Sequence, residues 1–545
     1  MSPGGCEVSE TTDVLIIGAG AAGMAAALSA HAAGAAVTLV EKGDRLGGTA
    51  AVSGGIIWAA NNPRMQAAGM ADSDDDALAY FGSLDHGEMD ADVLGAFVRE
   101  APGALAFLED AGALAVSILP SYPDYYLDRP GAKPEGGRAL DNELFDFTTL
   151  GPWAEKVFSD GVIQRMMLRE TPLGGSSGFV DPAELKRRAD ADLRGFGQAM
   201  VGRLLAACLA RGIEPQLGMK ADRLIVEAGR VVGVEFASGR SIRASRGVIL
   251  ATGGFEWNQS LKKTFLRGPL DMPASPPGNT GDGLKLAMSV GAGLGNMTSA
   301  WWVPTLSIGG AQWPGGEERA SPVLIERTLP HSLMVNRAGK RFCNEANNYS
   351  SLAGAFHQFD PATYDYPNNP AWLVFDAQYR ARYPLGTVMP FDPLPDAVFV
   401  ADTLEELAAR IGVDAAAFVQ TVERFNTHAA NAEDPDFGRG VSAYDHFYGD
   451  RSRPGAAATL GPLVQGPFHA VQLKLGALGT NGGAKTNAAA QVLDVDGEPI
   501  PGLYGAGNVI ACPTGSVYAG AGGTLGPALT FGCIAGRTAA RLANQ

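Results

Sequence analysis

A glycine motif directly after a short apolar run constrains the fold of this chain more than any other feature. The run Asp13-Val-Leu-Ile-Ile leads into Gly18-Ala-Gly20-Ala-Ala-Gly23, and an alanine-rich segment and a second apolar run, 36–40, follow. This order predicts a buried strand, a tight turn, a helix and a parallel strand. Glycines at this spacing let the backbone approach a pyrophosphate at the helix N-terminus. Glu41, at the end of the second run, is placed to accept hydrogen bonds from a ribose.

Three further glycine-rich stretches indicate how long the bound dinucleotide is. A glycine turn of this kind can also serve packing alone, but here the strand, helix, second strand and acid all fit a dinucleotide site. The stretch 47–55 follows the acidic residue directly, which NAD does not require. Residues 247–254 and 502–508 are further apolar runs that end in glycine turns. These separated turns favour FAD, held by distant segments of one chain.

Composition limits the partners and the compartment. The 545 residues predict two or three folding units, and 46% hydrophobic residues are enough for a large core. A net charge of −16 argues against a nucleic-acid partner. Five cysteines without a CxxC pair predict free thiols and a reducing, cytoplasmic location: they are Cys6, Cys208, Cys343, Cys512 and Cys533.

The apolar stretch 14–40 is long enough to be mistaken for a membrane span. Its preceding flank is acidic, with Glu7, Glu10 and Asp13, and the spaced glycines interrupt it. We therefore expect no transmembrane helix and no targeting signal. Peripheral contact with a membrane through an apolar patch remains compatible with the sequence. The Pro/Gly-rich excursion 120–185 could form a lid, such a patch, or a packed surface segment.

Taken together, these motifs resemble the FAD-binding fold of the fumarate reductase and 3-ketosteroid dehydrogenase superfamily. The resemblance spans nearly the whole chain and includes 281–283, 478–483, 494–504 and an expected hairpin over 334–345. It implies an α/β architecture with a discontinuous Rossmann-like FAD-binding domain. That domain would comprise 1–303 and 468–545, and a smaller α+β catalytic, or capping, domain over 304–467 would interrupt it.

Several stretches resemble the 3-ketosteroid dehydrogenase branch in particular. They are Ala300-Trp-Trp-Val-Pro, 434–440, 444–450 and Tyr518-Ala-Gly-Ala-Gly-Gly-Thr-Leu-Gly-Pro. The resemblance implies FAD-dependent introduction of the Δ1 double bond into a 3-ketosteroid, with loss of the C2 proton and hydride transfer from C1 to flavin N5. No histidine follows Gly47-Gly48, so we expect FAD to be non-covalent. The Arg-Gly-Glu-Gly-Gly pattern of dicarboxylate reductases is absent from the sequence.

The chemistry of this reaction assigns roles to a few residues. A ketone must be polarised, and the O–H of Tyr518 with the N–H of Gly522 would do this as two fixed donors, much as in an oxyanion hole. By resemblance, Tyr349 is the base. A phenol titrates near pH ~10, so it needs a partner that stabilises its phenolate, and the resemblance offers Tyr125 or Tyr126, with Tyr122 less favoured. Any single tyrosine is otherwise more often a packing residue.

The remaining expectations concern the residues that contact the cofactor and the alternative functions. The resemblance implies FAD contacts from Gly18, Gly20, Ala22, Gly23, Glu41, Lys42, Gly48, Thr49, Ala50, Ser53, Gly54, Gly55, Ala221, Ala251, Thr252, Gly253, Asp282, Gly507, Asn508, Thr524 and Leu525. No metal site is expected, and electrons would leave to a quinone or another acceptor. The alternatives are Δ4-(5α) desaturation, reduction of an unsaturated acid, and a flavin electron-transfer or sensor protein. Arg337, Lys340 and Arg341 are expected on a solvated hairpin face, and Trp301-Trp302 as a core or pocket wall.

Overall fold

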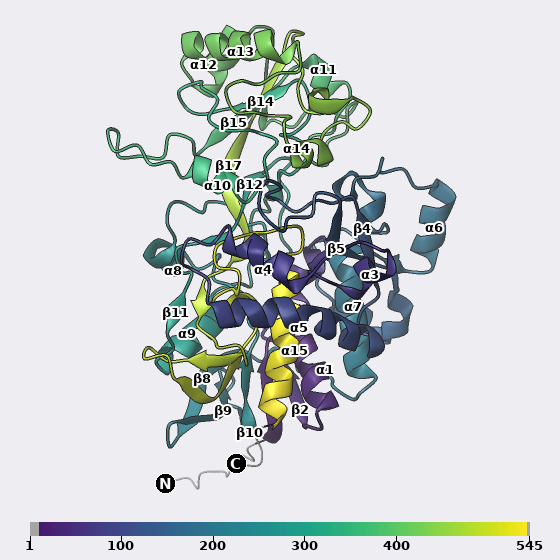
Figure 1. The fold of residues 1–545 in the computed structure, drawn as a ribbon, viewed down its shortest axis with the longest axis vertical. Helices are drawn as coiled ribbons and strands as arrows, with labels where there is room; N and C mark the ends of the chain where they lie inside the picture. Colours follow the sequence, from purple (N-terminus) through teal and green to yellow (C-terminus); the bar gives the residue numbers. More distant parts are fainter. Residues whose placement is uncertain (1–9, 542–545) are drawn as a thin grey trace.

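A seven-stranded sheet forms the centre of the larger part of the molecule in the computed structural model, which describes residues 10–541 (Figure 1). Its strand order is β19-β20-β10-β1-β2, with β9 paired to β10 and β8 paired to β9. The strands are β1 (Glu10–Ile17), β2 (Val37–Val40), β8 (Ala221–Glu227), β9 (Arg230–Phe236), β10 (Ser241–Leu250), β19 (Gln491–Leu493) and β20 (Pro499–Gly505). The strand pairs β20–β10, β10–β1 and β1–β2 are all parallel. The four apolar runs expected to end in the cofactor site are therefore adjacent strands of one sheet.

Two helices packed closely together cover the central strands. They are α1 (Ala21–Ala32), which follows the first glycine turn, and α15 (Leu525–Arg541), the last helix described (Figure 1). Close packing depends on small side chains: a Cβ at Gly532 would lie 2.5 Å from the Ala22 carbonyl oxygen. Ser29 adds a hydrogen bond to the carbonyl of Cys533 at 2.7 Å. Residues far apart in sequence thus share one core.

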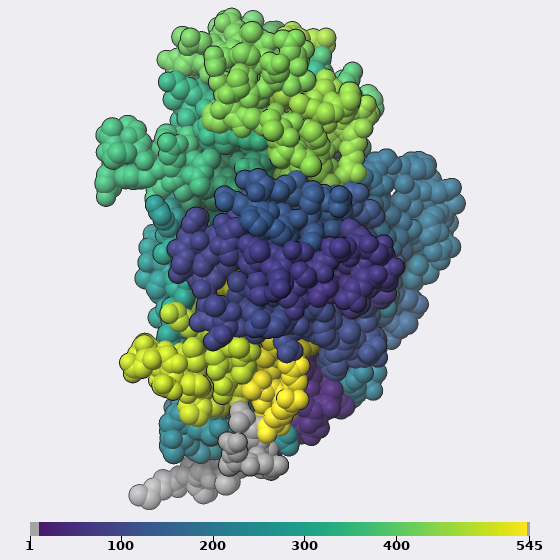
Figure 2. All heavy atoms as spheres, viewed as in Figure 1, coloured from purple at the N-terminus to yellow at the C-terminus, as the bar shows by residue number. Residues whose placement is uncertain are grey.

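A second, six-stranded sheet forms the smaller part, which we call the capping unit (300–480). Its order is β13-β12-β17-β15-β14, with β16 also paired to β17. The strands are β12 (Ala300–Leu306), β13 (Ser321–Pro322), β14 (Ser332–Val335), β15 (Ala371–Phe375), β16 (Val398–Ala401) and β17 (Phe468–Thr480). Most of this unit is the green upper part of Figure 1 and Figure 2. The expected domain boundaries fall inside β12 and just before β17, two strands paired with each other, and the division into domains stays a prediction.

Helices cover both faces of the second sheet. On one face, α12 (Leu404–Ile411) and α13 (Ala415–Ala429) bury a cluster that includes Leu333 and Val374. On the other face, α10 (Leu352–Phe356) and α11 (Ala377–Arg380) pack against Met334 and Leu373. Successive residues of β14 and β15 point to opposite faces of the sheet, so each strand contributes side chains to the apolar cluster on either face. This part of the chain has the α+β composition that was expected.

The remaining helices and strands range from two-residue strands to the 20-residue helix α5. They are α2 (Gly48–Val52), β3 (Ile57–Trp58), α3 (Pro63–Ala67), α4 (Asp74–Gly82), α5 (Ala91–Asp110), β4 (Val116–Pro120), β5 (Gly136–Asn142), β6 (Phe145–Asp146), α6 (Pro182–Asp190), β7 (Leu193–Arg194), α7 (Phe196–Leu209), α8 (Gln259–Phe265), α9 (Asp282–Ser289), β11 (Leu294–Gly295), α14 (Ala443–Phe447) and β18 (Gly483–Ala484). Among residues 10–541, no helix has both the length and the apolar character needed to cross a membrane. Four cysteines in this range are free, and Cys6 lies outside it.

The hairpin expected over 334–345 is wrong in its second arm. The strand β14 pairs with β15, and 341–345 form no strand. The chain turns where the N–H of Asn336 donates to the carbonyl of Lys340 at 2.9 Å, and it then leaves the sheet. Arg337 and Lys340 are exposed, as expected. Arg341 is not: its side chain is 5% exposed, because Glu345 and Asp434 pair with it.

Much of the excursion 120–185 is packed into the protein. Its strand β5 is buried throughout and pairs with both β3 and β4. Trp153 and Phe158 pack against the main core. Val162, Ile163 and Phe179 are exposed, the last at 77%. A lid or membrane-contact role for the exposed part stays a prediction.

Candidate active site

The predicted cofactor residues gather at the carboxyl ends of the parallel strands. The turn after β1 is held tightly against the turn after β10, since a Cβ at Gly18 (φ +107°) would lie 2.4 Å from the Ala251 carbonyl oxygen. A Cβ at Gly23 would lie 1.8 Å from the carbonyl oxygen of Gly18. Only glycine fits either position, and each glycine leaves the backbone accessible at the start of α1. Gly20, Thr252 and Gly253 belong to the same two turns, and Ala22 lies in the first turn of α1.

Charged residues lie beside the turn that follows β2. Glu41 accepts hydrogen bonds from the backbone N–H of Ala19 and of Gly43, both at 3.0 Å, so it orders the glycine turn. Lys42 forms a 2.5 Å ion pair with Asp282 at the start of α9. Ala221 begins β8, two residues after Met219, whose N–H donates to the Glu41 carbonyl at 2.8 Å. The structure thus brings these predicted cofactor residues into one region.

The second glycine loop is tied to its surroundings by side chains. Asn279 donates to the hydroxyl of Thr49 at 2.8 Å. Ser53 donates to the carbonyl of Ala50 at 2.8 Å and accepts from the N–H of Gly55 at 3.0 Å. Gly48 begins α2, and a Cβ at Gly54 would lie 2.9 Å from Leu168. The loop therefore has a fixed backbone path.

The returning segment brings Thr524 and Leu525 to the start of α15. A cavity there is lined by Trp301, Asn481, Gly507, Asn508, Thr524 and Pro527, among others. The side chain of Asn508 accepts from the indole of Trp301 at 3.3 Å. The buried hydroxyl of Thr252 has no partner within residues 10–541. Constricted glycine turns, an unpaired buried hydroxyl and two helix N-termini fit an extended, anionic dinucleotide such as FAD.

Three tyrosines from distant segments meet beside this cavity. The O–H of Tyr125 donates to the hydroxyl of Tyr349 at 2.9 Å. The ring of Tyr518 stacks on Tyr125, with centroids 5.7 Å apart and planes 10° apart, and meets Tyr349 edge-on at 5.5 Å. Trp301 packs edge-on against Tyr518 at 5.1 Å. Between the two open alternatives, geometry places Tyr125, not Tyr126, against Tyr349.

Hydrogen bonds to one carbonyl hold the loops of Tyr125 and Tyr518 together. The Ala519 carbonyl accepts from the N–H of Tyr125 at 2.9 Å and from the hydroxyl of Tyr80 at 2.8 Å. The Tyr80 hydroxyl in turn accepts from the N–H of Tyr126 at 3.1 Å. Tyr126 therefore anchors the loop by its backbone. Tyr80 is a residue that sequence reasoning missed.

Gly522 occupies a backbone conformation that suits a donor role. Its φ is +91°, and a Cβ there would lie 2.5 Å from the backbone nitrogen of Trp58. Its carbonyl accepts from that nitrogen at 3.2 Å. Gly522 is buried, yet within residues 10–541 its own N–H donates to no backbone acceptor. The hydroxyl of Tyr518, four residues earlier, accepts from Thr524 at 3.2 Å.

The tyrosine cluster extends further than the sequence indicated. Tyr122 lies with its hydroxyl 3.4 Å from that of Tyr125, and it also hydrogen bonds to the hydroxyl of Tyr448. Tyr349, Tyr125, Tyr122 and Tyr448 thus form a continuous line of phenol groups, which we call the tyrosine row. Tyr444 packs edge-on against Tyr125 at 5.0 Å. The stretch 444–450, which contains Tyr444 and Tyr448, was noted in the sequence for its resemblance to the 3-ketosteroid dehydrogenase branch. The sequence does not show which residues these two tyrosines contact.

Burial governs the ionisation of these phenols. It raises the pKa of Tyr349, Tyr125 and Tyr518 above the ordinary value. Burial also raises the pKa of Tyr448, to about 12, against the lowering effects of the Tyr122 hydrogen bond and the Arg327 charge. A protonated Tyr518 suits donation to a carbonyl, whereas a base at Tyr349 needs help to lose its proton.

Comparison with known proteins agrees with this geometry. The family described as "FAD binding domain" matches residues 13–525. The chain is 42% identical to 4-oxocyclohexanecarboxylate 2-dehydrogenase of Sinomonas cyclohexanicum, over 97% of this chain and 93% of that protein. It is 36% identical to 3-oxosteroid 1-dehydrogenase of Mycolicibacterium smegmatis, over 96% of each.

A solved structure gives the same result. The 3-ketosteroid Δ1-dehydrogenase of Sterolibacterium denitrificans, in complex with 1,4-androstadiene-3,17-dione, superposes with a TM-score of 0.87. The sequence identity is 37%, and the match covers 98% of this chain and 100% of that one. The resemblance inferred from the motifs is thereby confirmed. The chain belongs to the FAD-binding domain family, and it is an FAD-dependent oxidoreductase related to the 3-oxosteroid dehydrogenases.

Proposed function

We propose that this protein desaturates a cyclic ketone beside its carbonyl, and that the substrate is a 3-ketosteroid that receives a Δ1 double bond. The observation that carries the proposal is the meeting of Tyr349, Tyr125, Tyr518 and Gly522 next to the cavity at the start of α15. Two donors and one base are what enolisation of a ketone requires.

Each residue has one task in this proposal. The O–H of Tyr518 and the N–H of Gly522 donate to the ketone oxygen and stabilise the negative charge that develops there. Tyr349 removes the C2 proton, and Tyr125 donates to Tyr349 as it does in the structure. When bound, FAD supplies the acceptor for the hydride that leaves C1. The substrate thus loses one proton and one hydride, and a double bond forms between C1 and C2.

The walls of the site support an apolar substrate. The cluster around the tyrosines includes Leu119, Val303 and Phe447, and all three are buried. A ring system without charge would replace water there at little cost. We also expect FAD to be bound without a covalent link, and a quinone or another acceptor to reoxidise it.

A smaller substrate is the second candidate. The relative with 42% identity is named for 4-oxocyclohexanecarboxylate, a single ring that also carries a ketone. The same donors and base would serve its desaturation. The carboxylate of that substrate would need a cation or several donors beside the apolar walls of the site.

One anaerobic experiment separates the candidates. The purified yellow protein is mixed with androst-4-ene-3,17-dione or with 4-oxocyclohexanecarboxylate, flavin absorbance is followed, and the product is identified. We expect rapid bleaching and a 1,4-diene with the steroid. Bleaching only with the monocyclic acid would transfer the proposal to the second candidate. No bleaching with either ketone, but reoxidation of the reduced protein by an unsaturated acid, would overturn both.

A further inference from the structure

A buried carboxylate stands directly before Tyr125 in the chain. Asp124 is 3% exposed, and three N–H groups donate to its side chain. Its Oδ1 accepts from the indole of Trp58 at 3.0 Å. Its Oδ2 accepts from the backbone N–H of Lys133 at 3.0 Å and from the guanidinium of Arg138 at 2.8 Å. Because all three neighbours are donors, both oxygens act as acceptors, as in a carboxylate.

Arg138 holds this carboxylate from a fixed position in β5. The arginine is 1% exposed, and its guanidinium also binds both oxygens of Asp72, at 2.7 and 2.9 Å. A planar guanidinium that is bonded to two carboxylates has little freedom to move. Burial raises the pKa of Asp124, and the Arg138 charge opposes that rise. The place of the Asp124 side chain is therefore set by a buried ion pair.

Trp58, whose indole donates to Asp124, is the residue against which the segment of Gly522 packs. The backbone N–H of Trp58 donates to the carbonyl of Gly522 at 3.2 Å. A Cβ at Gly520 would lie 2.7 Å from the indole nitrogen, and a Cβ at Gly526 would lie 2.1 Å from the Trp58 carbonyl oxygen. The glycines thus allow this segment to lie directly against Trp58.

One carboxylate consequently connects the two sides of the candidate site. The residue after it, Tyr125, is the hydrogen-bond partner of the candidate base. From Asp124, two buried hydrogen bonds lead through Trp58 to Gly522. Together with the bond from the N–H of Tyr125 to the Ala519 carbonyl, they set the distance between the base side and the donor side.

We propose that Asp124 is a positioning residue for the reaction, which holds the hydroxyl of Tyr125 at a fixed place relative to the N–H of Gly522. The inference rests on the proposed function, in which the ketone oxygen accepts from Gly522 while the base removes a proton from the carbon next to the carbonyl. These two positions are fixed relative to each other within the substrate, so the protein groups that meet them must keep a matching separation. A misplacement of about 1 Å is enough to slow such a reaction about 100-fold.

Asp124→Asn tests this role with almost no change in side-chain size. An amide has one oxygen, and its nitrogen is a donor. The nitrogen would face either the indole of Trp58 or the donors of Arg138 and Lys133, so one side of the contact would be lost. Trp58→Phe removes the same bond from the other partner and keeps the backbone N–H that reaches Gly522.

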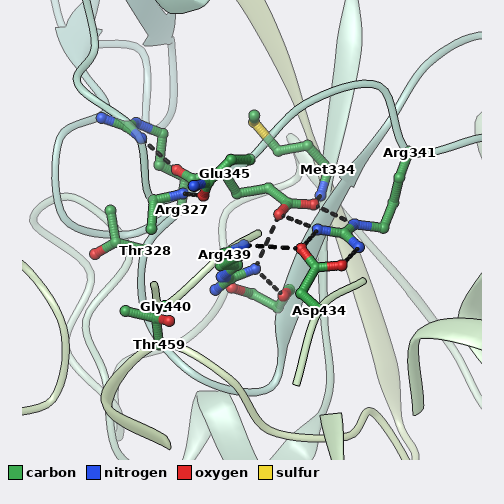
Figure 3. A network of polar contacts seen from close by, with 12 residues as sticks. Arg327, Thr328, Met334, Arg341, Glu345, Asp434, Arg439, Gly440 and Thr459 are labelled. Atoms are coloured by element: carbon green, nitrogen blue, oxygen red, sulfur yellow. Dashed lines mark hydrogen bonds and ion pairs between the residues drawn. The ribbon is translucent and has the colours of Figure 1, made fainter. Parts of the chain in front are cut away.

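A second buried ion pair provides the matched control. Figure 3 shows Asp434 paired with Arg341 in the capping unit. The side chain of Asp434 is 2% exposed, and it accepts hydrogen bonds from Arg341 and from the backbone N–H of Arg439. Asp434→Asn therefore removes a buried ion pair without altering the contacts of Asp124.

The first measurement is anaerobic flavin reduction of the holoprotein by androst-4-ene-3,17-dione, with and without deuterium at C2. We expect Asp124→Asn to slow the limiting rate about 10- to 100-fold, with little change in the steroid concentration that gives half of that rate. The C2 isotope effect should rise, because proton removal then limits the rate more strongly. Trp58→Phe should give the same changes and add nothing to Asp124→Asn. Asp434→Asn should leave the rate and the isotope effect unchanged.

A double variant tests whether Asp124 acts through Tyr125. In a Tyr125→Phe background, Asp124→Asn should slow the reaction much less than in wild type, because the hydroxyl that it positions is already absent. Additive slowing, or slower reduction with an unchanged isotope effect, would overturn the inference. If Asp124→Asn does not retain flavin, Trp58→Phe decides by the same criteria.

The same experiment separates this inference from the proposed function. If no ketone reduces the wild type, the proposed function fails, and the role of Asp124 fails with it. If the steroid reduces the wild type and Asp124→Asn at the same rate, the proposed function stands and the inference alone is wrong.

Discussion

Tyr125 and Tyr126 are adjacent in the chain, yet only the first has its hydroxyl against Tyr349. Replacing Tyr125 by phenylalanine removes a hydrogen bond to a group that must carry negative charge, which is worth about 1.5–3 kcal/mol. We expect flavin reduction by the steroid to slow about 10- to 100-fold in Tyr125→Phe.

Tyr126→Phe is the matched control, because the hydroxyl of Tyr126 faces Asn348 and Ser351 and not the hydroxyl of Tyr349. Stopped-flow measurement of both variants checks the assignment. Equal slowing in the two variants would refute a special role for Tyr125.

Substitution of Gly522 tests whether its N–H donates to the ketone together with the O–H of Tyr518. Alanine at φ +91° carries a strain of about 1–2 kcal/mol, and its Cβ would meet the Trp58 nitrogen at 2.5 Å. Displacement of the N–H should reduce kcat about 100-fold or more.

Gly497→Ala provides the comparison, since Gly497 has φ +89° and open space around its Cβ position. It should show the strain without the loss of activity. A normal kcat in Gly522→Ala would exclude this N–H as a donor to the ketone.

Sequence and structure agree unevenly for single residues. Tyr349 lies against Tyr518, and Gly522 stands four residues after Tyr518 in the same glycine-rich segment, as the resemblance implied. Arg341 was expected in solvent. Its partner Asp434 lies 93 residues away, and its second partner, Glu345, is only four residues on but is buried by packing that the local sequence does not show.

Among the elements, the turn between β1 and α1 decides whether a cofactor is held. A Cβ at Gly18 would lie 2.4 Å from the carbonyl of Ala251, so Gly18→Ala must separate the turns that follow β1 and β10. We expect FAD to bind at least about tenfold more weakly, a cost of about 1.4 kcal/mol.

The ratio of flavin to protein absorbance after dialysis measures this. Gly34→Ala is the control, because Gly34 also has positive φ (+84°) but nothing within 4 Å of its Cβ position. Full flavin content in Gly18→Ala would contradict the placement of the dinucleotide.

The segment that leaves β14 is held by buried charges, and its stability should depend on pH. Burial raises the pKa of Glu345, but the charges of Arg341 and Arg439 outweigh it and leave the pKa below the ordinary value. Its contribution is therefore fully present above about pH 4.3, the ordinary pKa of glutamate, and is lost as pH falls through the lowered pKa.

Glu345→Gln leaves two buried arginines short of a counter-charge and should cost about 3–5 kcal/mol of unfolding free energy near neutral pH. The loss should shrink on acidification. Asp436→Asn, which breaks the exposed pair with Arg424, should cost under about 1 kcal/mol. Chemical unfolding at several pH values compares them, and equal losses in both variants would contradict the role of the buried network.

For the whole molecule, the main sheet was predictable and the second sheet was less so. Apolar runs that end in a glycine turn or at Glu41 predict the four parallel strands, because each run carries its own local signal. The strand β17 (Phe468–Thr480) pairs with β12, β15 and β16, although its segment was assigned to the returning part of the FAD-binding domain. Antiparallel pairing between strands this far apart in the sequence depends on packing that a sequence pattern does not reveal.

The proposed reaction depends on proton removal by Tyr349 from a ketone held by Tyr518 and Gly522. The measurement that tests it most directly is the rate of anaerobic flavin reduction by androst-4-ene-3,17-dione, with and without deuterium at C2, in wild type and Tyr349→Phe. We predict that wild type forms the 1,4-diene and loses one C2 deuteron to water, and that Tyr349→Phe retains bound flavin but is at least about 100-fold slower. Desaturation at the wild-type rate by Tyr349→Phe would contradict the account.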